Sequence, residues 1–195
     1  MIALDSLRER IDGIVIGASA GGIEALSVLL PALPATLRPS LFIVLHLPRE
    51  RPSLLAEIFR TRCAVPVREA EDKEPAEPGT VYFAPPDYHM LVEKTRQIAL
   101  STDEPVHYSR PSIDVLFESA ADAYGERLLG IILSGGNQDG AAGLQAIHRA
   151  GGVTVVQEPD NAQVPVMIVS ALQRERADFV LCLDDIAALL QRLEK

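Results

Sequence analysis

Three shortages limit what this chain can be. Its 195 residues include only two cysteines, Cys63 and Cys182, which lie far apart and form no ligand-like cluster, so we expect packing residues rather than a redox or metal site. Lys and Arg number 18 against 27 Asp and Glu, and the net charge of -9 argues against a nucleic-acid-binding protein. Moreover, no stretch approaches the roughly 20 apolar residues of a membrane span.

The first ten residues, "MIALDSLRER", also lack the features of a secretion signal. Their apolar run is too short, and they carry charge throughout. We therefore expect a cytoplasmic protein that is not inserted in a membrane. The length suits one well-buried domain, whereas two domains would be cramped.

Strand-like runs alternate with helical patterns along the chain. The strand-like runs are mostly continuous apolar stretches such as "GIVIGA" and "VTVVQ", which are typical of strands buried on both faces of a sheet. Helical patterns separate them at 22–30, 52–62, 113–124, 141–150, 165–174 and 184–193. The alternation predicts an α/β fold with a doubly wound, mostly parallel sheet sandwiched by helices. Short strands and turn signals within 65–101 predict a short antiparallel hairpin insertion.

The stretch "GIVIGASAGGIEAL" places Ser19 between a strand and a helix. It lacks the second glycine of a dinucleotide fingerprint, and Ile23 stands where a phosphate-binding loop has lysine. Ligands of open α/β sheets bind at the carboxyl ends of strands, where Ser19 is placed. Two interpretations stay open at this point, because the serine can be a nucleophile or simply the N-cap of the helix.

A histidine and an aspartate occupy equivalent positions. His46 ends the apolar run "LFIVLH", and Asp139 follows "GIILSGG" just before a helical pattern. A nucleophile, a base and an orienting acid that meet at one edge of a sheet form a catalytic triad whatever their order in the chain. The alternative for Asp139 is again an N-cap. His89 and His107 lie in the irregular region and are given no catalytic role.

Several motifs, taken together, resemble the catalytic domain of the chemotaxis protein-glutamate methylesterases, the CheB-type family. They are "IGASAGG", "HLP", "EAED", "PGTVYFAPPDYHM", "RPSIDVLFESAA" and "GIILSGGNQDGAAGL", which stand in family order and cover nearly everything from Gly13 onward. The resemblance implies a doubly wound α/β fold. It also implies that Ser19 is the nucleophile, His46 the general base and Asp139 the orienting acid.

The resemblance further implies hydrolysis of glutamate methyl esters on the cytoplasmic helices of chemoreceptors, with release of methanol. Many members also convert receptor glutamines to glutamates. Backbone N–H groups of Ala20, Gly21, Gly22 and Gly136 are candidate donors to the oxyanion. The mechanism requires no metal and no organic cofactor. The implied partner is a methyl-accepting chemoreceptor.

The motifs depart from the family pattern close to the predicted triad. Family members usually read S-T-G-G, whereas Ala20 replaces the threonine here. They usually read T-G-M-G-N-D-G, whereas this chain reads "SGGNQDG", with Gly136 in place of methionine and Gln138 in place of asparagine. Leu45 and Leu47 flank His46, where glutamine and methionine are common. We expect these departures to affect rate, substrate preference or deamidation.

Three arginines are candidate substrate contacts, because a demethylated receptor bundle is acidic. Arg49, Arg51 and Arg110 lie near motifs that are placed on the predicted active edge. For Arg49 and Arg51 the alternative is a solvated surface side chain. For Arg110 the alternative is a structural role, in which its planar fork of donors holds loops together.

We divide the chain into an N-terminal segment or linker remnant at 1–12 and a methylesterase catalytic domain at 13–195. Typical family members carry an N-terminal receiver domain, and 12 residues are too few to form one. We therefore expect a stand-alone enzyme, a module of a longer chain, or a domain controlled by a separate receiver or histidine-kinase signalling partner. A competing expectation is that 1–12 forms a short lid over the active edge.

Two other functions fit the same fold, because a fold does not settle an activity. One is a non-catalytic docking module of a signalling system. The other is a hydrolase of another carboxylic ester.

Overall fold

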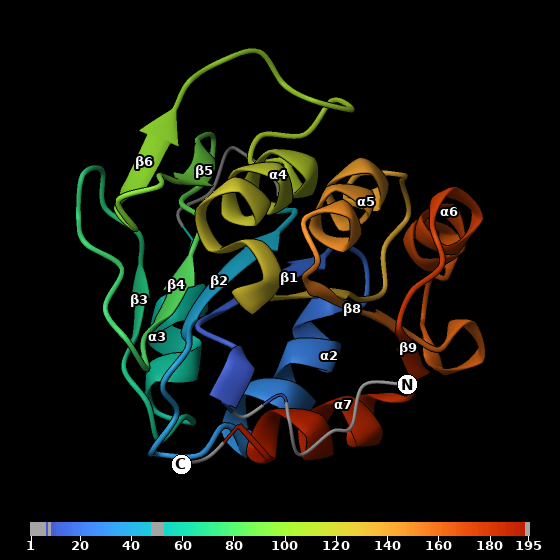
Figure 1. Ribbon diagram of the computed structural model, residues 1–195, viewed down its shortest axis with the longest axis horizontal. Helices are drawn as coiled ribbons and strands as arrows, with labels where there is room; N and C mark the ends of the chain where they lie inside the picture. The colour runs from blue at the N-terminus through green and yellow to red at the C-terminus, as the bar shows by residue number, and fades with distance from the viewer. Residues whose placement is uncertain (1–6, 8, 48–52, 194–195) are drawn as a thin grey trace.

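The computed structural model describes residues 7, 9–47 and 53–193 (Figure 1). Within this part of the chain, seven strands form one sheet in the order β3-β4-β2-β1-β7-β8-β9, and every neighbouring pair is parallel. The strands are β1 (Gly13–Ala18), β2 (Ser40–Leu45), β3 (Val67–Glu69), β4 (Val81–Phe83), β7 (Leu128–Ile132), β8 (Val153–Gln157) and β9 (Phe179–Leu181).

Helices cover both faces of this sheet. One face carries α2 (Gly22–Leu29), α3 (Leu55–Arg60) and α7 (Leu183–Gln191), and the other carries α4 (Ile113–Tyr124), α5 (Ala141–Arg149) and α6 (Val166–Arg174) (Figure 1). Side chains alternate across the pleat, so that Ile14 and Ile16 of β1 enter the first core whereas Val15 enters the second. Every residue of the central strands β1, β2, β7 and β8 is buried, which explains their continuous apolar runs.

The order of the strands reverses at β1. The chain adds β2, β3 and β4 on one side of β1, and later adds β7, β8 and β9 on the other. Such a switch point leaves a crevice outside the carboxyl ends of the two diverging strands, and ligands of open α/β sheets bind there. The loops that follow β1, β2 and β7 therefore surround the expected position of a site.

The insertion contains the predicted antiparallel hairpin, formed by β5 (His89–Val92) and β6 (Ile98–Ser101). Its apolar residues Met90, Val92 and Ile98 pack with Phe117 of α4 in the second core. The other two strands of this region, β3 and β4, join the edge of the main sheet in parallel. The predicted fold class, a doubly wound parallel sheet with a short antiparallel hairpin, is confirmed.

The described part of the N-terminal segment contacts the amino ends of the strands. Leu7 is buried in the first core, and Arg10 donates to the carbonyl of Glu126. Asp12 pairs with Arg127, which directly precedes β7. Residues 9–12 therefore lie at the opposite end of the sheet from Ser19, which does not fit a lid; residues 1–6 and 8 lie outside the described part. In that part, no helix is long and apolar enough to cross a membrane.

Candidate active site

Ser19 and His46 follow neighbouring strands at the same edge of the sheet. Ala18 and Leu45, the last residues of β1 and β2, are partners in the parallel ladder. The ladder continues by one more bond, in which the His46 N–H donates to the Ala18 carbonyl at 3.1 Å. Because adjacent strands lie about 4.8 Å apart, the residues that follow them are neighbours. Both side chains are partly exposed, so a ligand from solvent can reach them.

His46 is bonded to the predicted acid. Its Nε2 lies 2.8 Å from Oδ2 of Asp139, which follows β7 on the other side of β1 and is fully buried. A carboxylate can only accept here, so the Nε2 carries the proton and the Nδ1 keeps its lone pair. Within the described residues, the Ser19 hydroxyl makes no hydrogen bond to His46. The structure thus joins His46 to Asp139 directly and places Ser19 beside them through the backbone.

Asp139 remains ionised although it is buried. Burial alone would raise the pKa of its carboxyl group, but the bond from His46 and the bonds from backbone N–H groups hold the pKa below its usual value of 3.8. The backbone donors are Ile113 at 2.7 Å and Asp114 at 3.0 Å, and the Ser112 hydroxyl donates at 2.8 Å. These three residues begin α4, so the carboxylate lies at the positive end of that helix.

Asp114 in turn accepts hydrogen bonds from the start of α5, the helix that follows Asp139. Its Oδ1 accepts from the N–H groups of Gly140 at 2.9 Å and Gly143 at 2.7 Å, at the start of α5. Asp139 therefore caps α4, and Asp114 of α4 caps α5. Burial raises the pKa of Asp114, and the nearby charge of Asp139 raises it further. The pair fixes the two helix ends against each other and holds Asp139 in place.

A buried histidine, His89, holds Ser112 in position. His89 is 1% exposed, and its Nδ1 accepts from the N–H of Ser112 at 3.1 Å. Its Nε2 donates to the carbonyl of Glu104 at 3.1 Å. The imidazole thereby fixes the residue whose hydroxyl donates to Asp139.

The turn that carries Ser19 is closed by its own backbone. The Gly22 N–H donates to the Ser19 carbonyl at 2.8 Å, and Gly21 has φ 79° and ψ 2°, as a glycine at the third position of a type II turn does. A Cβ at Gly22 would lie 2.8 Å from the Cβ of Ala18 and 2.5 Å from the end of the Leu45 side chain, so glycine lets α2 begin this close to the end of β1. Among the predicted oxyanion donors, Gly22 is thus already bonded. The N–H groups of Ala20 and Gly21 have no acceptor in the described part of the chain.

Ser134 ties this turn to the neighbouring loops. Its hydroxyl donates to the Ala20 carbonyl at 2.7 Å and accepts from the Val164 N–H at 2.9 Å. Its carbonyl accepts from the Ser19 N–H at 2.9 Å. Ser134 is 1% exposed. Because C=O and N–H point in opposite directions in a trans peptide, holding the Ala20 carbonyl also fixes the direction of the Gly21 N–H.

The structure places the remaining candidate residues differently. Arg110 donates through Nε and Nη2 to Asp87, at 3.0 and 2.8 Å, and through Nη1 to the carbonyls of Thr102 and Asp103, so it holds loops together. A role of Arg110 as a substrate contact stays a prediction. Gly136 is exposed in the loop after β7. Arg49 and Arg51 lie outside the described residues.

Sequence reasoning missed the residues that support the site, namely Ser112, Asp114, Ser134 and His89. Ser112 and Asp114 look like an ordinary N-cap and a first-turn acid of α4, and their partners lie far away in the sequence. Ser134 gave one usable signal, since a polar residue that directly follows a buried apolar strand is unusual in a core.

The cysteines do not add a second site. Cys63 and Cys182 are free thiols, and burial raises the pKa of Cys63 to about 11. Within the described residues, no group of three or more His, Cys, Asp or Glu side chains could hold a metal ion.

A doubly wound sheet with a histidine–carboxylate pair at its switch point, beside a serine in a glycine turn, defines an α/β protein with the layout of a hydrolase. Comparisons with known proteins narrow this class. Residues 14–190 match the family model for CheB methylesterase. The chain therefore belongs to the CheB methylesterase family.

Individual relatives agree with this assignment. A Leptospira interrogans protein is 44% identical over 184 residues, covering 94% of this chain and 95% of the relative. A protein-glutamate methylesterase/protein-glutamine glutaminase of Bordetella parapertussis is 42% identical, and the match covers 92% of this chain but 53% of the relative. The crystal structure of the Thermotoga maritima CheB methylesterase catalytic domain matches with a TM-score of 0.87 at 29% identity, covering 94% of this chain and 98% of that one.

Proposed function

We propose that this chain hydrolyses methyl esters of glutamate side chains on the helices of methyl-accepting chemoreceptors in the cytoplasm, and that it also deamidates receptor glutamines. Ser19 is the nucleophile, His46 the general base and Asp139 the orienting acid. The observation that carries the proposal is the 2.8 Å bond from His46 to the buried Asp139 at the switch point, beside Ser19. The family supports the ester chemistry, and the names of relatives such as that of Bordetella parapertussis supply both activities.

In the first half of the reaction, the His46 Nδ1 takes the proton of the Ser19 hydroxyl while the serine oxygen attacks the ester carbonyl. The N–H groups of Ala20 and Gly21 donate to the oxyanion that forms, and Gly136 is a further candidate donor. The tetrahedral intermediate collapses, the imidazolium protonates the leaving methoxide, and methanol departs. The glutamyl group remains esterified to Ser19.

In the second half, a water molecule gives its proton to His46 and attacks this ester. The second intermediate releases the glutamate carboxylate and restores the Ser19 hydroxyl. Asp139 stabilises the imidazolium in both halves, because its four donors keep it ionised and fixed in position. A glutamine side chain follows the same course, with ammonia as the leaving group in place of methanol.

Within this proposal, residues 13–195 form the catalytic domain and 1–12 an N-terminal segment. The match covers about half of the Bordetella parapertussis relative, so the rest of that longer protein lies outside the aligned region. Control by a separate receiver or histidine-kinase partner is part of the proposal.

The experiment measures methanol release from receptor membranes that carry labelled methyl esters. The wild-type protein should release methanol, and Ser19→Ala should lower the rate by several orders of magnitude while the protein stays folded. Ser27→Ala, on the neighbouring helix α2, is the matched control and should keep the wild-type rate.

Other outcomes separate the alternatives. Hydrolysis of small esters without receptor turnover would favour a hydrolase of another carboxylic ester, and no hydrolysis at all would favour a docking module. Near wild-type turnover by Ser19→Ala would rule out the proposed nucleophile.

A further inference from the structure

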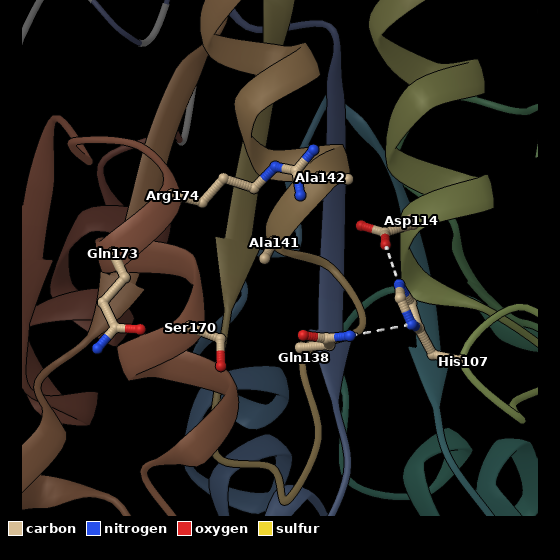
Figure 2. Close-up of a pocket in the computed structure, with 8 residues that line it drawn as sticks. All are labelled: His107, Asp114, Gln138, Ala141, Ala142, Ser170, Gln173 and Arg174. Atoms are coloured by element: carbon tan, nitrogen blue, oxygen red, sulfur yellow. Dashed lines mark hydrogen bonds and ion pairs between the residues drawn. The ribbon is translucent and has the colours of Figure 1, made fainter.

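A polar pocket of about 290 Å³ lies next to the candidate active site (Figure 2). It opens between the turn at 106–109, the start of α5 and the helix α6, and we call it the side pocket. Its polar lining consists of His107, Asp114, Gln138, Ser170, Gln173 and Arg174. Figure 2 shows Arg174 extending from α6 toward α5, with His107 and Gln138 on the opposite side.

The turn that forms one wall of the side pocket is firmly held. Val106 and Ser109 exchange both backbone hydrogen bonds, at 3.1 and 2.8 Å, around His107 and Tyr108. These two residues have φ 48° and φ 63°, the left-handed pattern of a type I′ turn, which costs free energy in residues other than glycine. Such a conformation persists only where its surroundings fix it.

The imidazole of His107 contributes to that fixation. Its Nε2 lies 3.5 Å from the Asp114 carboxylate, and its Nδ1 accepts from the Gln138 side chain at 3.4 Å (Figure 2). At the base of the loop, Arg110 bonds to the carbonyls of Thr102 and Asp103. The wall therefore stands in a defined position before any ligand arrives.

The side pocket shares its residues with the candidate active site. Gln138 directly precedes Asp139 in the chain, and the backbone N–H of Asp114 donates to Asp139. A molecule bound in the side pocket would therefore lie next to the carboxylate that orients His46.

The lining favours a ligand that accepts hydrogen bonds. Arg174, whose Nε donates to Gln145, has further N–H groups on its terminal nitrogens, and Gln173 and Ser170 also carry donors. Among the described lining residues, the carboxylate is that of Asp114, whose oxygens already face the N–H groups of α5 and the ring of His107. A carboxylate or a side-chain amide meets these conditions, and the guanidinium adds a charged bond to a carboxylate.

Tyr108 extends this surface at the tip of the turn. Its side chain is 98% exposed, the highest fraction among the large hydrophobic residues that the structure describes. An aromatic ring on a rigid turn loses little conformational entropy on contact and gains from the burial of its apolar area.

We propose that the side pocket and Tyr108 form a docking subsite for the helix that carries the scissile ester. The side pocket takes a carboxylate or amide side chain that lies one or two helical turns from the ester, and Tyr108 packs against the helix surface. Side chains three or four residues apart share one face of a helix, about 5–6 Å from each other, so one helix can offer both groups. This inference rests on the proposed function and explains how the enzyme selects its substrate helix.

The test compares two substrates, methylated receptor membranes and p-nitrophenyl acetate, which offers neither a helix nor a carboxylate or amide side chain for the side pocket. Arg174→Gln should raise KM for the receptor about 10-fold, since the variant loses the charged hydrogen bond to the ligand. Tyr108→Ala should raise it about 3-fold. In both variants kcat for the receptor, and both constants for the small ester, should stay within 2-fold of wild type.

Arg192→Gln is the matched control, because Arg192 is exposed at the end of α7 on the other face of the sheet. It should behave as wild type. Unchanged receptor kinetics in both test variants would overturn the docking subsite while leaving the proposed function intact, and an equal loss on both substrates would also overturn it. A wild-type protein that hydrolyses only the small ester would overturn the proposed function itself, and the docking subsite with it.

Discussion

Each end of the sheet has an aspartate that accepts several hydrogen bonds, but the two carboxylates differ in burial. At the carboxyl end, Asp139 is fully buried and accepts from four donors. At the amino end, Asp12 accepts from Arg127 and Arg96 and is partly exposed. Both pKa values lie below the usual one, but for different reasons. At Asp12 the bond from Arg127 is the largest cause, whereas at Asp139 the bonds must first overcome burial.

This difference predicts where a lost bond matters. An exposed carboxylate that loses its partner is solvated by water and loses little. A buried carboxylate that loses a partner remains charged in a poorly solvating environment, which is costly. Substitution of a carboxylate at the carboxyl end should therefore lower both activity and stability, whereas substitution at the amino end should affect both less.

The largest expected effect is that of Asp139→Asn. The amide cannot hold the His46 tautomer that leaves Nδ1 free, so kcat should fall on the order of 10⁴-fold. The measurement is hydrolysis of p-nitrophenyl acetate by folded protein. Asp12→Asn makes the same chemical change at the other end and should keep the wild-type rate. A similar loss in both variants would remove the contrast between the two ends.

A smaller effect is expected at Ser134, which holds the turn of Ser19. Ser134→Ala removes the bond to the Ala20 carbonyl and leaves the Val164 N–H without its acceptor. Since the Gly21 N–H is then less well aimed, kcat should fall about 10- to 100-fold with little change in KM. Ser134→Thr keeps the hydroxyl and should recover most of the rate. A rise in KM at constant kcat would contradict this positioning role.

The pH dependence of stability should also differ between the ends. The pKa of Asp139 is lower in the folded protein than in the unfolded chain, so its contribution is present above pH of about 4 and is lost as the pH falls through the folded value. Urea unfolding between pH 7 and pH 3 should show this loss, and Asp139→Asn should flatten it. Asp12→Asn should flatten the curve less, because water already screens that carboxylate. Equal flattening would contradict the comparison.

The smallest effect concerns the ion pair at the amino end. Asp12→Asn should change the free energy of unfolding at pH 7 by less than about 1 kcal/mol. The difference from wild type should shrink further in 1 M salt, since solvated pairs are screened. A loss of several kcal/mol, measured by urea unfolding, would show that this pair behaves like the buried carboxylates of the opposite end.

The sequence predicted the elements best where burial is complete. The predicted bounds of β1, β8 and α4 coincide with the observed ones, because continuous apolar runs mark the two strands and a helical pattern of apolar residues marks α4. The hairpin β5–β6 was predicted, but the pairing of β3 with the main sheet was not, since three-residue strands carry little pattern.

The candidate site also has some parts that the sequence predicts and others that it does not. Strand ends identified the positions of Ser19, His46 and Asp139, because parallel strands bring their carboxyl ends to one edge. The supporting contacts of Ser134 and Asp114 join loops that are 26 or more residues apart in the sequence. No local pattern encodes such contacts, so they became visible only in three dimensions.

The exchange of caps between α4 and α5 has a consequence for how the protein folds. The Ser112 hydroxyl caps α4 locally through the Val115 N–H, but Ile113 and Asp114 find Asp139, and the N–H groups at the start of α5 find Asp114, only after the two helices meet. Starting a helix is the unfavourable step, so the arrival of each helix further stabilises the start of the other. We therefore expect these helices to fold as one cooperative unit, in which the carboxylate beside His46 reaches its place only as that unit closes.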